Sequence, residues 1–262
     1  GYYELPNYDH KYRNWNRSGD GWVDMYTAIM RSNDTYFYDM AHKLGVDRMH
    51  DYMSRFGLGQ RVALDMYEET AGLMPSREWK RSRYRQPWYP GETVILGIGQ
   101  GYMQATPLQL AQATALMATR GKWIRPHLAR RIGGEPPVDP DPMPDIELRD
   151  PKFWDYSIHG MEQVLHGPRG TAKKVGDSAA YRIAGKSGTA QVVAIKQGEK
   201  YDSSRLAERH RDHALFVAFA PVQDPEIAVA VMVENGESGS GVAAPVAKAV
   251  LDAWLLDDSG QL

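Results

Sequence analysis

Two clusters of polar side chains in distant parts of the chain carry the groups that acyl transfer uses. They are Ser32-Asn33-Asp34 and Lys186-Ser187-Gly188-Thr189. The second cluster lies in a strand-like run, where alternation places Lys186 on one face and the Ser187 and Thr189 hydroxyls on the other. Because Gly188 has no side chain, the backbone of a substrate could approach the strand edge there. The ammonium and hydroxyl groups could then bind a carboxylate, and a strand N–H could stabilise an oxyanion.

Two nucleotide-binding interpretations of the glycine-rich segments fail on spacing. A phosphate-binding loop needs a glycine five residues before Gly185, where this chain has Ala180, and its lysine should open a helix. Residues 97–101 lack the third glycine of a dinucleotide-binding fingerprint, because Tyr102 stands in its place. Taken alone, the Lys186 motif is also compatible with an edge strand that bears an exposed lysine.

The composition is that of a globular protein and excludes several classes of function. The chain has 262 residues, of which 42% are hydrophobic and 24% charged, and its net charge is -2. The chain lacks the excess of basic residues that would indicate nucleic-acid binding, so we expect no nucleic-acid partner. The absence of cysteine excludes disulfides, thiolate zinc sites and cysteine nucleophiles. No apolar run approaches the roughly 18 to 20 residues of a membrane span.

Apolar spacing and capping residues predict a series of helices that must position these clusters. The predicted helices cover about 24–30, 36–44, 47–57, 106–121, 153–164 and 243–255. Asp47 is expected to cap the third. Thr106 and Gln109 predict a capping box at the fourth, with Pro107 at its first helical position. Residues 1–20 are expected to be irregular, and 59–91 show no clear period.

Strand signals follow late in the chain. They predict strands over 181–193, 213–220 and 226–234, with a turn at 221–225 that makes the last two an antiparallel hairpin. The Pro- and acid-rich segment 133–151 is expected to be a surface loop. Helices followed by strands and a closing helix predict the α+β class, with an antiparallel sheet flanked by helices.

Several ordered motifs together resemble class B penicillin-binding proteins, most of all the elongation-specific penicillin-binding protein 2 type. These motifs are Ser32-Asn33-Asp34-Thr35-Tyr36-Phe37-Tyr38, Arg77-Glu78-Trp79-Lys80 with Pro87-Trp88-Tyr89, Gly97-Ile98-Gly99-Gln100-Gly101 before Ala105-Thr106-Pro107, and Lys186-Ser187-Gly188-Thr189-Ala190-Gln191. Penicillin-recognising enzymes share the signatures Ser-x-x-Lys, Ser-Asp-Asn and Lys-Thr-Gly, and the chain matches the last two of these approximately. The resemblance covers nearly the whole chain and implies that residues 1–262 are the C-terminal portion of a transpeptidase domain.

The resemblance implies a peptidoglycan D,D-transpeptidase that cross-links stem peptides during cell elongation. By position, Ser32 would belong to a proton-relay network and Lys186 would support it electrostatically. Asp34 would contact the substrate amide and the general-base lysine, although most members have Asn there, and an ionised carboxylate cannot donate as that amide does. Ser187 and Thr189 would hold the terminal carboxylate of the substrate beside Gly188, and the Thr189 N–H would supply half of an oxyanion hole.

The nucleophile motif of the family does not occur in this sequence. No serine is followed three residues later by lysine; Thr171-Ala172-Lys173-Lys174 is a threonine variant, which we interpret as a loop with solvated charge. The chain also begins with Gly1 rather than Met. We therefore expect the attacking serine and the general-base lysine to lie upstream of Gly1, and this piece alone not to acylate.

The family implies a bacterial inner-membrane protein whose catalytic domain lies in the periplasm. Its expected partners are peptidoglycan stem peptides, β-lactams as suicide substrates, a membrane glycan polymerase and cell-shape scaffold proteins. No cofactor is expected. Two other functions stay open at this point: a serine β-lactamase of the same fold, which would hydrolyse its acyl-enzyme quickly, and a non-catalytic penicillin-recognising sensor or scaffold.

Three groups of acidic residues and histidines could be mistaken for metal sites. They are Glu208, His210 and His213; Asp9, His10 and Asp20; and Asp139, Asp141, Asp145 and Glu147. Each lies in a loop-like segment without convergent ligand spacing. We interpret them as solvated polar residues and expect no metal.

Overall fold

The computed structural model describes residues 1–193, 201–257 and 259–262. The helices are α1 (Met25–Arg31), α2 (Asp34–Leu44), α3 (Val46–Ser54), α4 (Arg77–Tyr84), α5 (Pro90–Leu96), α6 (Pro107–Ala118), α7 (Lys152–His166), α8 (Lys173–Gly176) and α9 (Ala244–Leu255). The strands are β1 (Tyr2–Glu4), β2 (Lys11–Arg13), β3 (Ala184–Ala190), β4 (His213–Ala220) and β5 (Ile227–Val233).

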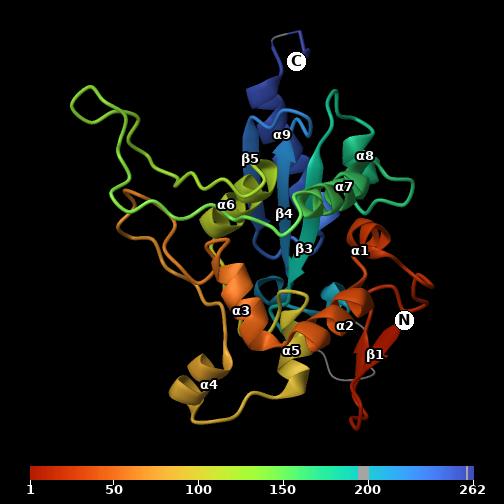
Figure 1. The fold of residues 1–262 in the computed structure, drawn as a ribbon. Coiled ribbons are helices and arrows are strands. Elements are labelled where there is room, and N and C mark those ends of the chain that lie inside the picture. Colours follow the sequence, from red (N-terminus) through yellow and green to blue (C-terminus); the bar gives the residue numbers. More distant parts are fainter. Residues whose placement is uncertain (194–200, 258) are drawn as a thin grey trace.

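A three-stranded antiparallel sheet with the order β3-β4-β5 lies at the centre of the fold (Figure 1). In its register Lys186 faces Val217 of β4, and Phe216 of β4 faces Val231 of β5. The predicted hairpin of the last two strands is therefore confirmed. Within the described residues no strand pairs with the second edge of β3, so the Lys186 strand is an edge strand.

Helices cover both faces of this sheet. Ala214, Phe216 and Ala218 alternate along β4 and are buried in the core that α9 closes. Phe219 points to the opposite face, where it packs with Leu116 of α6 and residues of α7. Figure 1 shows α6 and α7 in front of the sheet and α9 behind it. The predicted α+β class, with helices flanking an antiparallel sheet, is confirmed.

The first twenty residues are not irregular, contrary to the expectation from the sequence. They contain a β1-β2 hairpin in which Tyr3 pairs with Tyr12. Tyr12 is buried with Tyr38 of α2 and Val94 of α5. Strands of three residues are too short to display an alternating pattern, so the sequence has no strand signal there.

The segment 59–91 contains α4 and the start of α5, which the sequence pattern did not predict. Helix α4 is rich in Arg and Lys and buries only Lys80, so it has no apolar stripe. The predicted cap at Asp47 is also wrong: α3 begins at Val46 after Gly45, and the Asp47 carboxylate instead accepts a hydrogen bond from the Arg77 N–H.

The strand expected over 181–193 is shorter, because the backbone before it bonds to side chains. The Ile183 N–H donates to His166 Nε2 at 3.0 Å, which removes it from the strand ladder. Tyr181 and Ile183 are buried all the same and belong to the core. The capping box at α6 is as predicted, with Thr106 Oγ1 accepting from the Gln109 N–H at 3.1 Å.

A long loop over 122–145 extends from the end of α6 away from the sheet (Figure 1). After this loop, the chain packs against the rest of the fold at Ile146. Ile146 is buried, and its N–H donates to Gly121 O at 2.8 Å. Within the described ranges, no helix combines the length and the apolar character that crossing a bilayer requires.

Candidate active site

The turn between α1 and α2 holds Ser32 in an unusual backbone conformation. Asp24 caps the start of α1 by accepting from the Thr27 N–H at 2.8 Å. Ser32 ends this helix with φ 53° and ψ 49°, the left-handed region that residues other than glycine rarely adopt. Asn33 then begins α2 by accepting from the Tyr36 N–H at 3.0 Å. The serine side chain therefore projects from a tight two-residue connection between two capped helices.

Strand β3 brings Lys186 to this turn. Its Nζ donates to Ser32 Oγ at 2.8 Å and to the Ser187 carbonyl oxygen at 2.8 Å. The two polar clusters that lie far apart in the sequence thus meet in space. Because the ammonium donates to the hydroxyl oxygen of Ser32, the hydroxyl proton is free to be donated to a neighbouring group.

Asp34 lies near Lys186 but is held by the N-terminal segment. Its carboxylate accepts from the Trp15 N–H at 2.8 Å, and its own N–H donates to Asn14 Oδ1 at 2.8 Å. Both residues are described, and no hydrogen bond or close ion pair joins Asp34 to Lys186, although their charges attract each other. The expected contact of Asp34 with a general-base lysine involves a residue outside this sequence and stays a prediction.

Burial moves the pKa values of both Asp34 and Lys186 closer to neutral pH. It raises the pKa of Asp34 to about 6, against the opposing effects of the Trp15 hydrogen bond and the Lys186 charge. It lowers the pKa of Lys186 to about 8, which the charge of Asp34 partly offsets. Asp34 and Lys186 are therefore both mostly ionised at pH values between about 6 and about 8. A proton can leave or join the site near neutral pH.

The remaining residues of the strand line the same edge. Ser187 Oγ lies 3.3 Å from Thr171 Oγ1, and the Thr189 carbonyl oxygen accepts from Gln100 Nε2 at 2.7 Å. A Cβ built on Gly188 would meet only Leu215 Cβ, at 3.4 Å, which is ordinary contact. The fold itself does not require glycine at this position, so the open space there is available to an approaching substrate.

Sequence reasoning missed several residues of this site. Thr171 stands out in the sequence only as the start of a threonine variant of the nucleophile motif, and Lys173, which precedes the lysine of that variant, pairs with Asp177. Asn14 and Trp15 lie in a segment without periodic pattern, and nothing in the sequence signals that they bond to Asp34. The glycine pattern marks 97–101 as a turn-rich segment, but it does not reveal the bond that Gln100 makes.

The groups considered as metal sites have other partners. His213 Nδ1 accepts from the Asn235 N–H at 2.9 Å, and His10 packs against the Tyr12 ring with centroids 4.5 Å apart. Asp145 accepts from the Trp123 N–H at 2.8 Å. Among the described residues no set of three or more histidines and carboxylates has an arrangement that could hold a metal ion.

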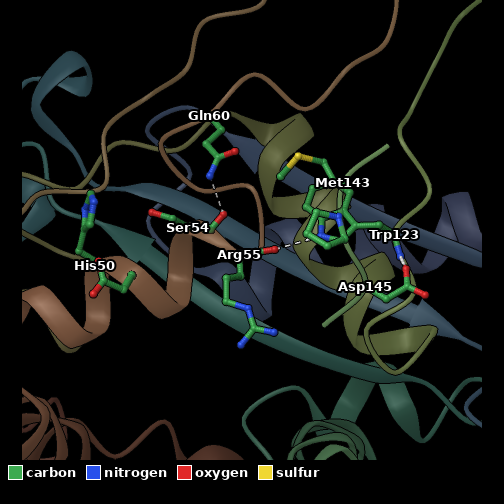
Figure 2. A pocket seen from close by; sticks show the side chains of 9 residues that line it. His50, Ser54, Arg55, Gln60, Trp123, Met143 and Asp145 are labelled. Carbon is green, nitrogen blue, oxygen red and sulfur yellow. Dashed lines mark hydrogen bonds between the residues drawn. The ribbon is translucent and has the colours of Figure 1, made fainter. Parts of the chain in front are cut away.

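A cavity of about 420 Å³ lies beside α3 and shares no lining residue with either cluster. Figure 2 shows its wall of His50, Ser54, Arg55, Gln60, Trp123, Met143 and Asp145. Two of its polar groups are engaged within the wall: Trp123 Nε1 donates to Arg55 O at 3.1 Å, and Gln60 Nε2 donates to Ser54 O at 2.9 Å. The cavity is a separate feature from the Ser32–Lys186 site.

An edge strand with Lys-Ser-Gly-Thr beside a serine on an interhelical turn agrees with the motifs that resemble those of penicillin-binding proteins. The chain matches the penicillin binding protein transpeptidase domain over residues 3–252, and it belongs to that family.

Its relatives include proteins named peptidoglycan D,D-transpeptidase and PBP2. The peptidoglycan D,D-transpeptidase MrdA of Haemophilus influenzae is 44% identical over 258 residues, which are 97% of this chain and 40% of the relative. The solved structure of Pseudomonas aeruginosa PBP2 in complex with WCK 5153 is 71% identical, with a TM-score of 0.93 over 100% of this chain and 54% of that one.

A complex of PBP2 with MreC from Helicobacter pylori is also similar. It is 31% identical, with a TM-score of 0.82 over 97% of this chain and 44% of that chain. The chain thus spans about 40% of the length of the curated relatives it matches. The resemblance to class B penicillin-binding proteins, and to the penicillin-binding protein 2 type in particular, is confirmed.

Proposed function

We propose that the whole protein is a peptidoglycan D,D-transpeptidase of the elongation type, and that residues 1–262 form the C-terminal portion of its catalytic domain. A serine attacks the D-Ala-D-Ala end of a donor stem peptide, D-Ala leaves, and an amine of a neighbouring stem accepts the acyl group. No Ser-x-x-Lys occurs in this sequence, so the proposal assigns the nucleophile and general base to another part of the whole protein.

The observation that carries the proposal is the contact of Lys186 Nζ with Ser32 Oγ at 2.8 Å beside an open strand edge. In the proposed mechanism Ser32 relays a proton between the general base and the leaving group. The Lys186 ammonium stabilises negative charge that develops along this relay. Its pKa of about 8 means that it is mostly charged at neutral pH.

The substrate would bind along β3. An extended stem peptide can add to the second edge of this strand, and Gly188 leaves room for its backbone. The hydroxyls of Ser187 and Thr189 would hold the terminal carboxylate, and the Thr189 N–H would contribute to the oxyanion hole. Asp34 would contact the substrate amide as an acceptor. A β-lactam would occupy the same places because it resembles the D-Ala-D-Ala end.

The relatives also support a proposed location and proposed partners for the whole protein. The whole protein would be anchored in the bacterial inner membrane with this domain in the periplasm. It would act with a membrane glycan polymerase and with cell-shape scaffold proteins. The Helicobacter pylori PBP2 complex contains MreC, which supports a partner of the latter kind.

Stable labelling of the whole protein by a fluorescent penicillin tests the proposal. A transpeptidase forms an acyl-enzyme that persists for many minutes, and the labelled protein should also lose the ability to cross-link stem peptides. An acyl-enzyme that forms and is quickly hydrolysed would indicate a β-lactamase. Stable labelling without any turnover of stem peptides by the unlabelled protein would indicate a sensor or scaffold.

A further inference from the structure

Asp20 is a buried carboxylate outside the two clusters, and its hydrogen bonds converge on the turn that carries Ser32. Its side chain is 2% exposed. Its donors are Arg31 Nε at 3.1 Å and Asn16 Nδ2 at 3.3 Å on Oδ1, and Asn33 Nδ2 at 3.1 Å and Asn14 Nδ2 at 3.3 Å on Oδ2. Each carboxylate oxygen therefore has two donors, and three of the four donor residues are asparagines.

This carboxylate sets the direction of two asparagine amides. Burial raises the pKa of Asp20, but the hydrogen bonds from Asn33, Arg31 and Asn16 outweigh burial and hold that pKa below its usual value. An ionised carboxylate only accepts, so Asn14 and Asn33 must turn their NH2 groups toward it. Their amide oxygens then face away from Asp20, toward the start of α2.

Both oxygens bind backbone N–H groups on which the site depends. Asn14 Oδ1 accepts from the Asp34 N–H at 2.8 Å, and Asn33 Oδ1 accepts from the Tyr36 N–H at 3.0 Å. If either amide were reversed, its NH2 group would face a backbone donor and the bond would be lost. Asp20 thus acts on the first turn of α2 through both neighbours.

Arg31, the residue before Ser32, is also fixed by several interactions. Besides its bond to Asp20, Arg31 donates from Nη1 to Arg169 O at 3.1 Å. Its guanidinium lies over the Trp15 ring at 5.3 Å, and Trp15 Nε1 donates to Arg31 O at 3.0 Å. A serine in the left-handed region persists only where the surrounding structure over-determines it, and these bonds supply that constraint.

We propose that Asp20 is a positioning residue of the acyl-transfer site, which fixes the left-handed turn at Ser32 so that Ser32 Oγ meets Lys186 Nζ. The inference rests on the proposed function, because it assigns the turn a role in acylation. Asp20 makes no hydrogen bond to Ser32 or Lys186, which are both described, and it acts through its bonds to Asn14, Asn33 and Arg31.

Asp20→Asn in the whole protein is the test. Asparagine replaces one acceptor oxygen with an NH2 group, which would face donors that already point at it. The rate constant of acylation by a penicillin should fall about tenfold to a hundredfold, since small displacements of relay groups have effects of this size. The dissociation constant of the non-covalent complex should stay within about twofold, because β3 is untouched. A variant that merely loses stability would lower the labelled fraction instead.

Amide hydrogen exchange gives a second readout that needs no activity. In Asp20→Asn the peptide spanning 31–36 should exchange about tenfold faster or more, while peptides of α9 keep the wild-type rate. Asn16→Ala is the matched control, because the Asn16 side chain bonds Asp20 and Gly19 O but makes no hydrogen bond to the described residues 31–34. It should stay within about threefold of wild type in both measurements.

Each outcome decides the inference. Unchanged exchange over 31–36, or an Asn16→Ala effect as large as that of Asp20→Asn, overturns it. If Asp20→Asn does not fold, Asn14→Ala takes its place, since it cuts the link to the Asp34 N–H, and it should show the same faster exchange and slower acylation. Wild-type protein that no penicillin labels would contradict the proposed function, and the exchange of the 31–36 peptide would still decide the role of Asp20.

Discussion

Replacing Asp34 with Asn should move the alkaline limit of acylation to lower pH. Lys186 has a pKa of about 8 because burial lowers it, and the charge of Asp34 is what opposes this effect. Without that charge, burial acts unopposed and the pKa of Lys186 falls below 8. A lysine is charged below its pKa and neutral above it, so activity that needs the ammonium is kept at low pH and lost as the pH rises.

The size of the effect follows from this titration. With a pKa of about 8, about half of the molecules carry a charged Lys186 at pH 8 and about one in eleven at pH 9. The wild-type acylation rate should therefore fall about tenfold between pH 7 and pH 9 through this group alone. Each unit by which Asp34→Asn lowers the pKa makes the variant lose up to tenfold more at the alkaline end. Asn can still accept from the Trp15 N–H, so the geometry is kept.

The assay is the rate constant of penicillin acylation of the whole protein from pH 6 to pH 10. The ratio of variant to wild-type rates should decrease from about pH 7 to about pH 9 and then become constant, because above both pKa values the two proteins lose the ammonium in parallel. Asp39→Asn is the matched control, because Asp39 lies on the same helix and pairs with Lys43, and its ratio should stay flat. In a Lys186→Met background Asp34→Asn should leave the alkaline part of the profile, above about pH 8, unchanged. A constant ratio for Asp34→Asn over the whole range would refute the reasoning.

Two further predictions concern the surroundings of the site. Lys80 is 1% exposed, pairs with Glu92 and lies 4.4 Å from the centroid of the Tyr89 ring, so Lys80→Met should lower the free energy of unfolding by about 3–5 kcal/mol. Urea denaturation should show a smaller loss for Lys80→Met with Glu92→Gln, and an equal or larger loss in the double variant would contradict a buried pair. At Gly239 a Cβ would lie 2.4 Å from the Gly188 carbonyl oxygen; Gly239→Ala should cost about 1–3 kcal/mol and slow acylation, and wild-type values for both would show that β3 does not depend on this contact.

The sequence was most informative where structure depends on local pattern. The capping box of Thr106 and Gln109 needs only residues three apart, and β4 has an alternation long enough to recognise. By contrast, α4 is held by one buried lysine rather than by an apolar face, and the strands of the β1-β2 hairpin are too short to have a period. Such elements owe their existence to tertiary contacts that no local pattern encodes.

The residues of the candidate active site also differ in whether the sequence could predict them. The motif around Lys186 and the motif at Ser32 could be recognised from residue types and order, and the structure brings the two together at 2.8 Å. Their supports could not be recognised, because Asp20 accepts hydrogen bonds from four side chains whose spacing follows no pattern, and Gln100 acts through one hydrogen bond to β3. The left-handed conformation of Ser32 was equally hidden, since a serine carries no signal for positive φ comparable to that of glycine.

The measurement that tests the central claim most directly is the penicillin acylation rate of Lys186→Met in the whole protein. Methionine keeps the length of the side chain and removes the ammonium that contacts Ser32 Oγ. The rate constant should fall on the order of 100-fold, as for the loss of one preorganised electrostatic group. Lys173→Met, which removes an exposed partner of Asp177, should keep the wild-type rate. A wild-type rate for Lys186→Met would contradict the assignment of this strand to the acyl-transfer site.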